Sequence, residues 1–225
     1  MLFKHGAILN CKDNIGETPL FSAVRRSAGP ILDRLLELGA DVSATDTEGR
    51  TALWALPIKS YSVYLVDKGS RLLQKGLDPM HRDNLGQTFL HVACHSAVVD
   101  RLYLDVVREA VKFGLDVDAL DDSGRTPLMN AARSGNQDFI LFLFTLGVDA
   151  NRVDHDGRTL LTEAVRSCDR RLGSYDSMVH RFLEYGVKPH ASAEAEHNPL
   201  FLAVGNASEE VVEQLLEHID IGLHG

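Results

Sequence analysis

One six-residue pattern, Asp-x-x-Gly-x-Thr, occurs five times and limits the possible folds of this chain more than any other feature. The copies begin at Asp13, Asp46, Asp83, Asp121 and Asp154. Their threonines follow one another after 33, 37, 38 and 33 residues, and Asn198 takes the same place 39 residues after the last of them. An enzyme needs a catalytic loop once, so a fivefold motif points first to architecture. A period near 33 with small insertions indicates stacked structural units.

The segment 121–151 shows what each copy encodes. Asp at the first position and Gly at the fourth favour a tight turn, with the Asp side chain bound to nearby backbone amides. Thr126 is placed to cap a helix that begins at Pro127 and ends at Gly135. A second, almost wholly apolar helix follows, and Gly147 ends it. We therefore expect each unit to consist of a turn, two helices and an extended segment.

These units resemble the ankyrin repeat, whose signature is Thr-Pro-Leu-His-x-Ala followed by a helix that ends in Gly-Ala-Asp-Val-Asn. The matching stretches are TPLFSA, TALWAL, TFLHVA, TPLMNA and TLLTEA, and the units close with GADVSA, GLDPMH, GLDVDA, GVDANR and GVKPHA. Only His91 keeps the family histidine, for which the resemblance implies a local hydrogen bond. The resemblance covers about residues 2–219. It implies an all-α fold, an ankyrin-repeat α-solenoid with short β-hairpin-like finger loops.

We expect a single ankyrin-repeat domain over residues 1–225. It would contain a half-repeat and six repeats, at about residues 1–12, 13–45, 46–82, 83–120, 121–153, 154–192 and 193–225. From the threonine to the helix-ending glycine, the first and fourth repeats have 21 residues, whereas the second, third and fifth have 25, 26 and 27. The extra residues are therefore expected between or within the paired helices, where surface insertions cost little free energy.

The second repeat is the most irregular. Pro57 is expected to end its first helix early, and Gly69 to interrupt its second helix. Trp54, Tyr61 and Tyr64 gather at this irregularity. Two interpretations stay open for these aromatic side chains: cover for an irregular core, or an interaction site.

Composition excludes several classes of protein. The chain is 44% hydrophobic and 24% charged, which is typical of a soluble globular protein. Its formal charge of −9 argues against binding to nucleic acid or to an anionic membrane. Three cysteines without zinc-site spacing, and no signal-peptide-like apolar segment, favour an intracellular setting, cytoplasmic or nuclear.

The sequence offers little that suggests catalysis. His91 and His95 have the spacing of two zinc ligands on a helix, but no third ligand is placed with them. The DHDG at Asp154 lacks the acid that a calcium loop needs at its twelfth position. Cys94 falls in a core position of its helix. We predict no enzymatic activity, no metal and no cofactor.

A binding surface has more support. The resemblance implies that fingers and first helices line one concave surface, and cations recur on both. The candidate partner-binding residues are Arg25, Arg26, Arg50, Lys59, His95, Arg125, Arg133, His155, Arg158 and Arg166. Acidic residues lie close by in the fingers: Glu17, Glu48, Asp122 and Asp156. A locally basic groove and an ordinary solvated face therefore both stay open.

The sequence thus predicts a non-enzymatic protein-interaction module, a scaffold or adaptor that binds an acidic or phosphorylated protein or peptide. We expect no nucleic-acid or membrane partner, and a monomer or a segment of a longer repeat array. The alternative is a targeting or regulatory segment of a larger enzyme or ubiquitin-ligase assembly. Nucleic-acid binding is a third class, which a steep salt dependence would identify.

Overall fold

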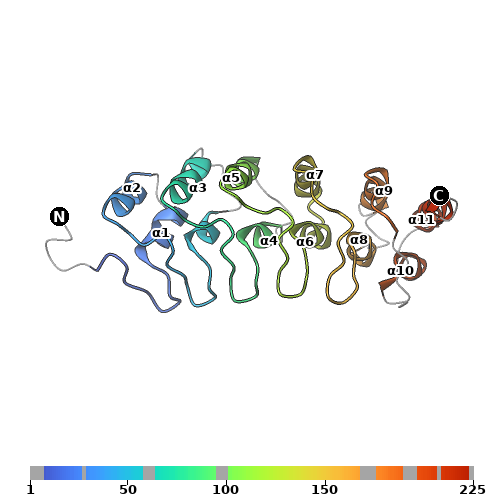
Figure 1. Cartoon of the computed structure of the whole chain (residues 1–225), viewed down its shortest axis with the longest axis horizontal. Coiled ribbons are helices and arrows are strands. Elements are labelled where there is room, and N and C mark those ends of the chain that lie inside the picture. Colours follow the sequence, from blue (N-terminus) through green and yellow to red (C-terminus); the bar gives the residue numbers. More distant parts are fainter. Residues whose placement is uncertain are drawn as a thin grey trace. The chain divides into compact units, whose positions relative to one another are not determined.

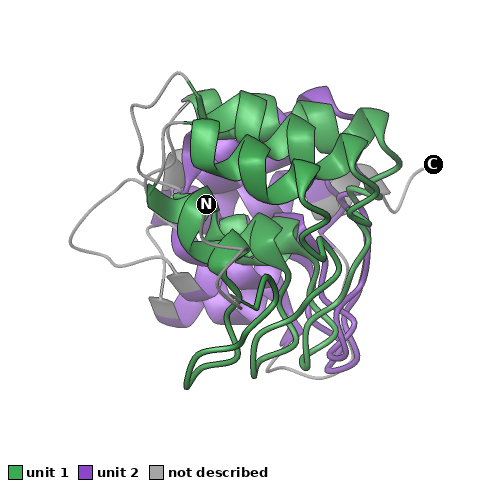
Figure 2. Ribbon diagram, turned by 90° about the vertical axis from the view of Figure 1, so that its left-hand side faces the viewer, with its two compact units in different colours: residues 1–93, 98–117 green, residues 94–97, 118–225 purple. Residues whose placement is uncertain are grey.

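The computed structural model describes residues 8–26, 29–57, 64–94, 101–167, 176–189, 197–206 and 209–222. Over these residues the fold is all-α, as predicted, with eleven α-helices and one short 3-10 helix (Figure 1). Residues group into two compact units (Figure 2). Unit 1 contains Met1–Ala93 and Val98–Val117, and unit 2 contains Cys94–Ala97 and Asp118–Gly225.

Unit 1 holds its helices in two layers, and its finger loops extend from one of them (Figure 1). The layer next to the fingers contains α1 (Pro19–Arg26), the 3-10 helix η2 (Ala52–Ala55) and α4 (Phe89–Ala93). The other layer contains α2 (Pro30–Glu37), α3 (Leu65–Gln74) and α5 (Arg101–Lys112). Helix α1 packs against α2 and η2, and α3 packs against α5. The first helix of a repeat therefore contacts both its own partner and the next repeat.

Unit 2 repeats this plan. Its first helices are α6 (Pro127–Ser134), α8 (Leu160–Ser167) and α10 (Pro199–Asn206). Its second helices are α7 (Gln137–Thr145), α9 (Asp176–Glu184) and α11 (Glu209–Gly222). Helix α8 packs against α6 and α10 as well as against α9, and α11 packs against α9 and α10. The apolar face of each inner repeat is thus covered by its neighbours.

The repeat at 121–151 has the predicted local structure. The side chain of Thr126 accepts a hydrogen bond from the amide of Met129 (3.3 Å), and α6 begins at Pro127. Gly135 ends α6 in the left-handed conformation, with φ of 71°. Asn136 then caps α7 with its side chain, a cap that the pattern did not predict.

The finger turns confirm the role assigned to aspartate. In the first finger, Asp13 Oδ1 accepts hydrogen bonds from the amides of Ile15 (3.0 Å) and Glu17 (2.9 Å). The corresponding aspartate oxygens of the other four fingers each accept the same two bonds. Antiparallel bridges join Thr45 to Thr51 and Val153 to Thr159, so these fingers are hairpin-like as the resemblance implied.

Successive fingers are joined by backbone hydrogen bonds. In unit 1, the amide of Thr47 donates to the carbonyl of Ile15 (3.0 Å), and the amide of Asn84 donates to that of Glu48 (2.9 Å). A side chain on Gly49 would meet this neighbour, because an ideal Cβ there lies 2.5 Å from Asn84 Oδ1. The finger glycine therefore serves two purposes, a positive φ and the close approach of the next finger.

The same contact exists in unit 2. The amide of His155 donates to the carbonyl of Ser123 (2.9 Å). An ideal Cβ on Gly124 would lie 2.6 Å from the ring of His155. Both units thus use one glycine-dependent contact to set the spacing of their fingers.

Alanine substitutions at two glycines distinguish the need for a positive φ from the need for close approach of the next finger. Gly49 and Gly76 have similar positive φ angles, 78° and 90°, but nothing lies within 4 Å of a Cβ on Gly76. We expect Gly76→Ala to lower the free energy of unfolding by about 1–2 kcal/mol, the conformational cost alone. Gly49→Ala should lower it by about 1–3 kcal/mol more, because the next finger must move. Urea unfolding of both variants measures the difference, and equal losses would refute the close-approach role.

The irregular second repeat follows one prediction and contradicts another. Its first helix is the short η2, which ends at Ala55 just before Pro57, as expected. The predicted interruption at Gly69 is wrong, because α3 runs unbroken from Leu65 to Gln74. A Cβ on the buried Gly69 would lie 3.0 Å from Val106 Cγ1. The glycine lets α3 and α5 pack closely, and the packing more than offsets its low helix propensity.

The aromatic residues of this repeat take part in packing. The Trp54 ring meets the rings of His81 and Phe89 edge-on, at centroid distances of 5.9 and 6.3 Å. These contacts support the interpretation of Trp54 as cover for an irregular core. Tyr64 is about half exposed. Tyr61 lies outside the described residues, as do segments 58–63, 95–100 and 168–175 between the paired helices, so the expected place of the extra residues stays a prediction.

Two residues of the third repeat have the predicted structural roles. His91 is fully buried, and its Nδ1 accepts a hydrogen bond from the amide of Thr88 (3.2 Å), which confirms the local bond that the resemblance implied. Cys94 is also fully buried, and burial raises the pKa of its thiol well above the usual value. A neutral thiol of this kind is poorly reactive.

A lysine fills one core position. Lys68 of α3 is only 4% exposed, and its Nζ donates to the carbonyl of Val24 near the end of α1 (2.9 Å). Burial lowers the pKa of Lys68 because the ammonium loses hydration. The cation nevertheless satisfies one of the carbonyls left without a partner at a helix C-terminus.

This environment predicts a pH dependence. The unfolded chain binds the Lys68 proton more tightly than the folded one, so this group contributes more stability as pH rises from its folded-state pKa toward the ordinary lysine value. Lys68→Met should remove that contribution, whereas Lys75→Met, at an exposed position beside α3, should keep it. Urea unfolding between about pH 7 and pH 10 tests this, because identical slopes for both variants would contradict it.

Candidate protein-binding surface

The candidate arginines lie at two recurring places, the last turn of a first helix and the finger position just before the threonine, whereas His155 is the second residue of its finger. Unit 1 contributes Arg25, Arg26 and Arg50. Unit 2 contributes Arg125, Arg133, His155, Arg158 and Arg166. The candidates Lys59 and His95 lie outside the described residues.

Arg25 is held by a buried acid. Its two terminal nitrogens each bind one carboxylate oxygen of Glu17, with Nη1 at 3.0 Å from Oε2. The Arg25 side chain is 42% exposed, whereas that of Glu17 is 7% exposed. This hydrogen bonding raises the pKa of Arg25 above its ordinary value. A bidentate pair fixes the guanidinium in one orientation and neutralises much of its charge.

Arg50 is bound within its own finger. Its Nε donates to Asp46 Oδ2 (2.8 Å), and its Nη2 lies 2.7 Å from the same oxygen. Nη1 pairs with Glu48 Oε2 at 2.9 Å. Because Asp46 also accepts the two amides of the turn, Arg50 completes the finger. Its charge is therefore used locally.

Arg125 reaches into the next repeat. Its Nε lies 3.4 Å from Asp154 Oδ2, and its Nη2 lies 3.8 Å from Glu163 Oε1. Both carboxylates are almost completely buried, and Arg125 itself is 17% exposed. This arrangement links the fourth finger to the fifth finger and to α8. Removal of the arginine would leave two buried acids without this cation.

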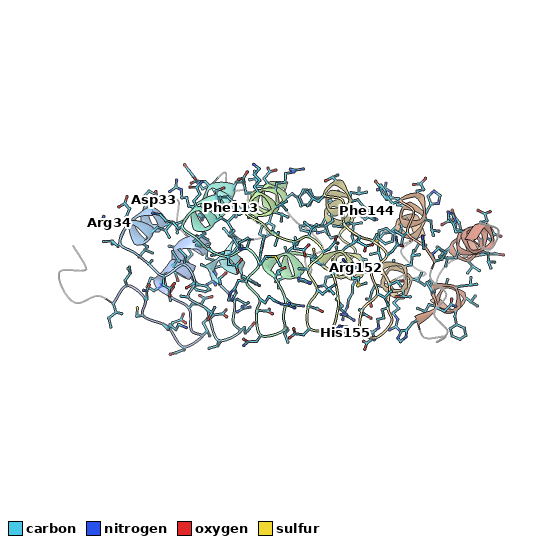
Figure 3. All side chains as sticks on the ribbon, in the orientation of Figure 1. Asp33, Arg34, Phe113, Phe144, Arg152 and His155 are labelled. Carbon is cyan, nitrogen blue, oxygen red and sulfur yellow. The ribbon has the colours of Figure 1, made fainter. Side chains whose placement is uncertain are left out.

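Two other candidates lie in the fifth finger. Arg158 pairs through Nη1 with Asp156 Oδ2 (3.1 Å), and this acid is well exposed. His155 is exposed on the finger loop (Figure 3). The fifth finger therefore presents charges of both signs to solvent.

The remaining candidates end the first helices. Arg26 ends α1, and Arg133 and Arg166 lie in the last turns of α6 and α8. All three are exposed. Cations at these places are favoured by the helix dipole, which makes a helix C-terminus electronegative.

Sequence reasoning found the cations and half of the acids that bind them. Glu17, Glu48 and Asp156 were recognised as close, whereas Asp46, Asp154 and Glu163 were not. A signal exists for Asp46, because the turn brings the first and fifth residues of a finger together. The pairing of Arg125 with Glu163 joins residues from different repeats and has no such local signal.

Among the described residues, no three His, Cys, Asp or Glu side chains are grouped as metal ligands. Over the same part of the chain, no helix is both long enough and apolar enough to cross a membrane.

Comparison with known proteins identifies the family of these repeats. The model for ankyrin repeats in three copies matches residues 64–154 and 95–191, together more than half of the chain. The chain belongs to the ankyrin repeat family. Ankyrin repeats generally bind other proteins and are typically non-catalytic.

Curated relatives share the repeats with this chain. NF-kappa-B inhibitor zeta of Mus musculus is 31% identical over 162 residues, which cover 60% of this chain and 22% of that protein. Neurogenic locus notch homolog protein 1 of Mus musculus is 31% identical over 143 residues, which cover 63% of this chain and 5% of that protein. The chain therefore matches less than a quarter of the length of either relative.

Neighbouring arginines provide a matched test of the Glu17 pair. Arg25→Met should lower the free energy of unfolding by about 1–3 kcal/mol, because Glu17 stays buried without its cation. Arg26→Met removes the same charge from the next, exposed position and should change stability by about 0.5 kcal/mol or less. Urea unfolding at neutral pH compares the two variants, and equal effects would show that the pair does not stabilise the fold.

Proposed function

We propose that this chain is a non-enzymatic protein-interaction module, a scaffold or adaptor that binds an acidic or phosphorylated segment of a partner protein. The observation that supports this most directly is the exposure of Arg133 and Arg166 at equivalent places in consecutive repeats. Both belong to unit 2, where α6 packs against α8. Family membership supports a protein partner in general.

The distance between the two arginines suggests how acidic groups are spaced in the partner segment. Packed helices lie about 8–10 Å apart, so the last turns of α6 and α8 offer two cations at roughly that separation. A peptide in the polyproline II conformation rises about 3.1 Å per residue with about three residues per turn, so acidic groups three residues apart lie on one side, about 9 Å from each other. A partner segment of the form acid-x-x-acid therefore matches the two arginines. Phosphoserine would match better, because its three oxygens accept bidentate arginine contacts.

The other arginines support the surface without serving as its main charges. Arg25, Arg50 and Arg125 are each bound to acids of the chain, and the acids beneath Arg25 and Arg125 are buried. A ligand that competed for them would leave those acids without a cation, at a considerable free-energy cost. Because Arg133 and Arg166 are exposed at equivalent places, we assign ligand binding in unit 2 to them, with the exposed His155 on the neighbouring finger.

A charge-matched pair of variants tests this assignment. Arg133→Gln/Arg166→Gln should weaken binding of a labelled Glu-Ala-Ala-Glu peptide by about tenfold or more, as expected for the loss of charge-assisted hydrogen bonds. Arg108→Gln/Arg181→Gln removes two exposed charges from the second helices α5 and α9 and should leave binding within about twofold. Fluorescence anisotropy measures both affinities.

The same titration with a Gln-Ala-Ala-Gln peptide shows whether charge decides recognition. Equal affinities for the acidic and neutral peptides would refute an acidic ligand. A matching loss in both double variants would show that only the total charge of the protein matters. A phosphoserine peptide that binds no better than the glutamate peptide would remove phosphorylation from the proposal.

A second candidate function rests on the relatives. Both are far longer than this chain, which matches 22% and 5% of their lengths. The repeats could therefore serve as the targeting or regulatory segment of a larger protein, an enzyme or a ubiquitin-ligase assembly. A transcript that joins these repeats to a catalytic or recruiting domain would establish that role.

A further inference from the structure

Contacts between repeats show which positions of a repeat face the following repeat. Trp54, the third residue after its threonine, touches Phe89 of the following repeat (6.3 Å). Phe144, three residues before its helix-ending glycine, stacks on Tyr185 of the following repeat at a centroid distance of 4.4 Å. The carbonyl of Val24, the sixth residue after its threonine, accepts the bond from Lys68. These three positions therefore face the following repeat.

The last repeat exposes apolar residues at all three positions. Phe201 is 64% exposed, whereas the residues at its position in the first, third, fourth and fifth repeats are at most 2% exposed: Phe21, His91, Met129 and Thr162. Val204 is 66% exposed, and its counterparts in the same four repeats are fully buried: Val24, Cys94, Ala132 and Val165. In the last repeat Ile219 stands where the other repeats have their helix-ending glycine, so Leu216 corresponds to Phe144, and it is 46% exposed. We call Phe201, Val204 and Leu216 the trailing face.

The opposite face of a repeat is identified in the same way. The residue eight before the helix-ending glycine faces the preceding repeat, because Lys68 binds Val24 and Val106 lies against Gly69. In the first repeat this residue is Ile31, and it is 61% exposed. Its counterparts in the other five repeats are at most 4% exposed: Lys68, Val106, Phe139, Met178 and Val211.

Two neighbours of Ile31 are also more exposed than their counterparts. Leu35 is half-buried, whereas the five residues at its position elsewhere are at most 1% exposed: Leu72, Ala110, Leu143, Phe182 and Leu215. Pro19 is half-buried, whereas its five counterparts are buried. We call Pro19, Ile31 and Leu35 the leading face.

We propose that the trailing face of one copy of this chain stacks on the leading face of a second copy, head to tail. The chain already uses this kind of interface within each unit, because Trp54 packs on Phe89 in unit 1 and Phe144 packs on Phe182 in unit 2, in both cases a trailing position on a leading position. A second copy carries both sets on the same backbone framework. Such an interface is heterologous, so each copy keeps one face open for the next.

Charge gives this association a distinctive salt dependence. Each copy has a formal charge of −9, and Glu213 and Glu217 are exposed beside Leu216 on α11. Two copies therefore repel one another at low ionic strength. Salt screens this repulsion and does not weaken apolar stacking, so association should strengthen as salt is raised. Association through ion pairs would show the opposite trend.

Two single variants and their mixture test the proposal. Sedimentation equilibrium of the intact chain should give a mass that rises above the monomer value of 24.8 kDa with concentration. Phe201→Asp blocks the trailing face and Ile31→Asp blocks the leading face, so each variant alone should stay monomeric. Mixed, they should form a one-to-one complex that grows no further, because each supplies the face that the other lacks.

Leu85→Asp is the control variant, because Leu85 is 66% exposed on a finger and belongs to neither face. It should associate as the unmodified chain does, and circular dichroism checks that all three variants are folded. A monomer mass for the unmodified chain at every concentration and salt level would overturn the proposal. So would a mixture without a complex. Dimers of Ile31→Asp alone would show instead that two trailing faces pair symmetrically.

Discussion

The contact between neighbouring fingers is the constraint on which the stacking in each unit depends. A backbone amide of one finger donates to a carbonyl of the finger before it, as Thr47 does to Ile15 and His155 to Ser123. This bond can form because the finger glycine has no side chain and so leaves room for the backbone of the next finger. Aspartate holds the turn closed, and threonine stands at the start of the first helix. One short motif thus sets both the spacing between repeats and the point at which each helix begins.

Close packing around a glycine also explains the one wrong prediction about the fold. A glycine in a helix has low intrinsic propensity, so Gly69 was expected to interrupt α3. In the structure α3 is unbroken, and the missing side chain of Gly69 lets Val106 of the next repeat pack closely against it. Pro57 was predicted correctly because its effect is local and depends on its own ring. The helix cap at Thr126 and the finger turns also depend on nearby residues. Together with the repeat period of the threonines, these local signals were enough to predict the fold class.

For the candidate surface, too, the sequence predicts the local features and not the contacts between repeats. The positions of the cations follow from the repeat, so the sequence alone placed Arg25 and Arg133 on first helices. Their electrostatic environment depends on which acids the fold brings near, and Arg125 finds Glu163 in another repeat, 38 residues away. We therefore expect similar arginines to differ in role. Those bound to buried acids should mainly stabilise the stack, and we propose ligand binding for Arg133 and Arg166.

The lateral and end surfaces of the stack follow from one geometry but use different residues. The lateral positions recur in consecutive repeats, so Arg133 and Arg166 present two charges about one repeat apart and suit an extended acidic segment. The end positions are apolar, and most residues at the same positions of the other repeats are buried. The two proposed surfaces share no side chain, so head-to-tail association would leave Arg133 and Arg166 accessible. Each added copy would supply another pair of these arginines, and a partner with several acidic segments would bind the assembly more tightly than a single copy.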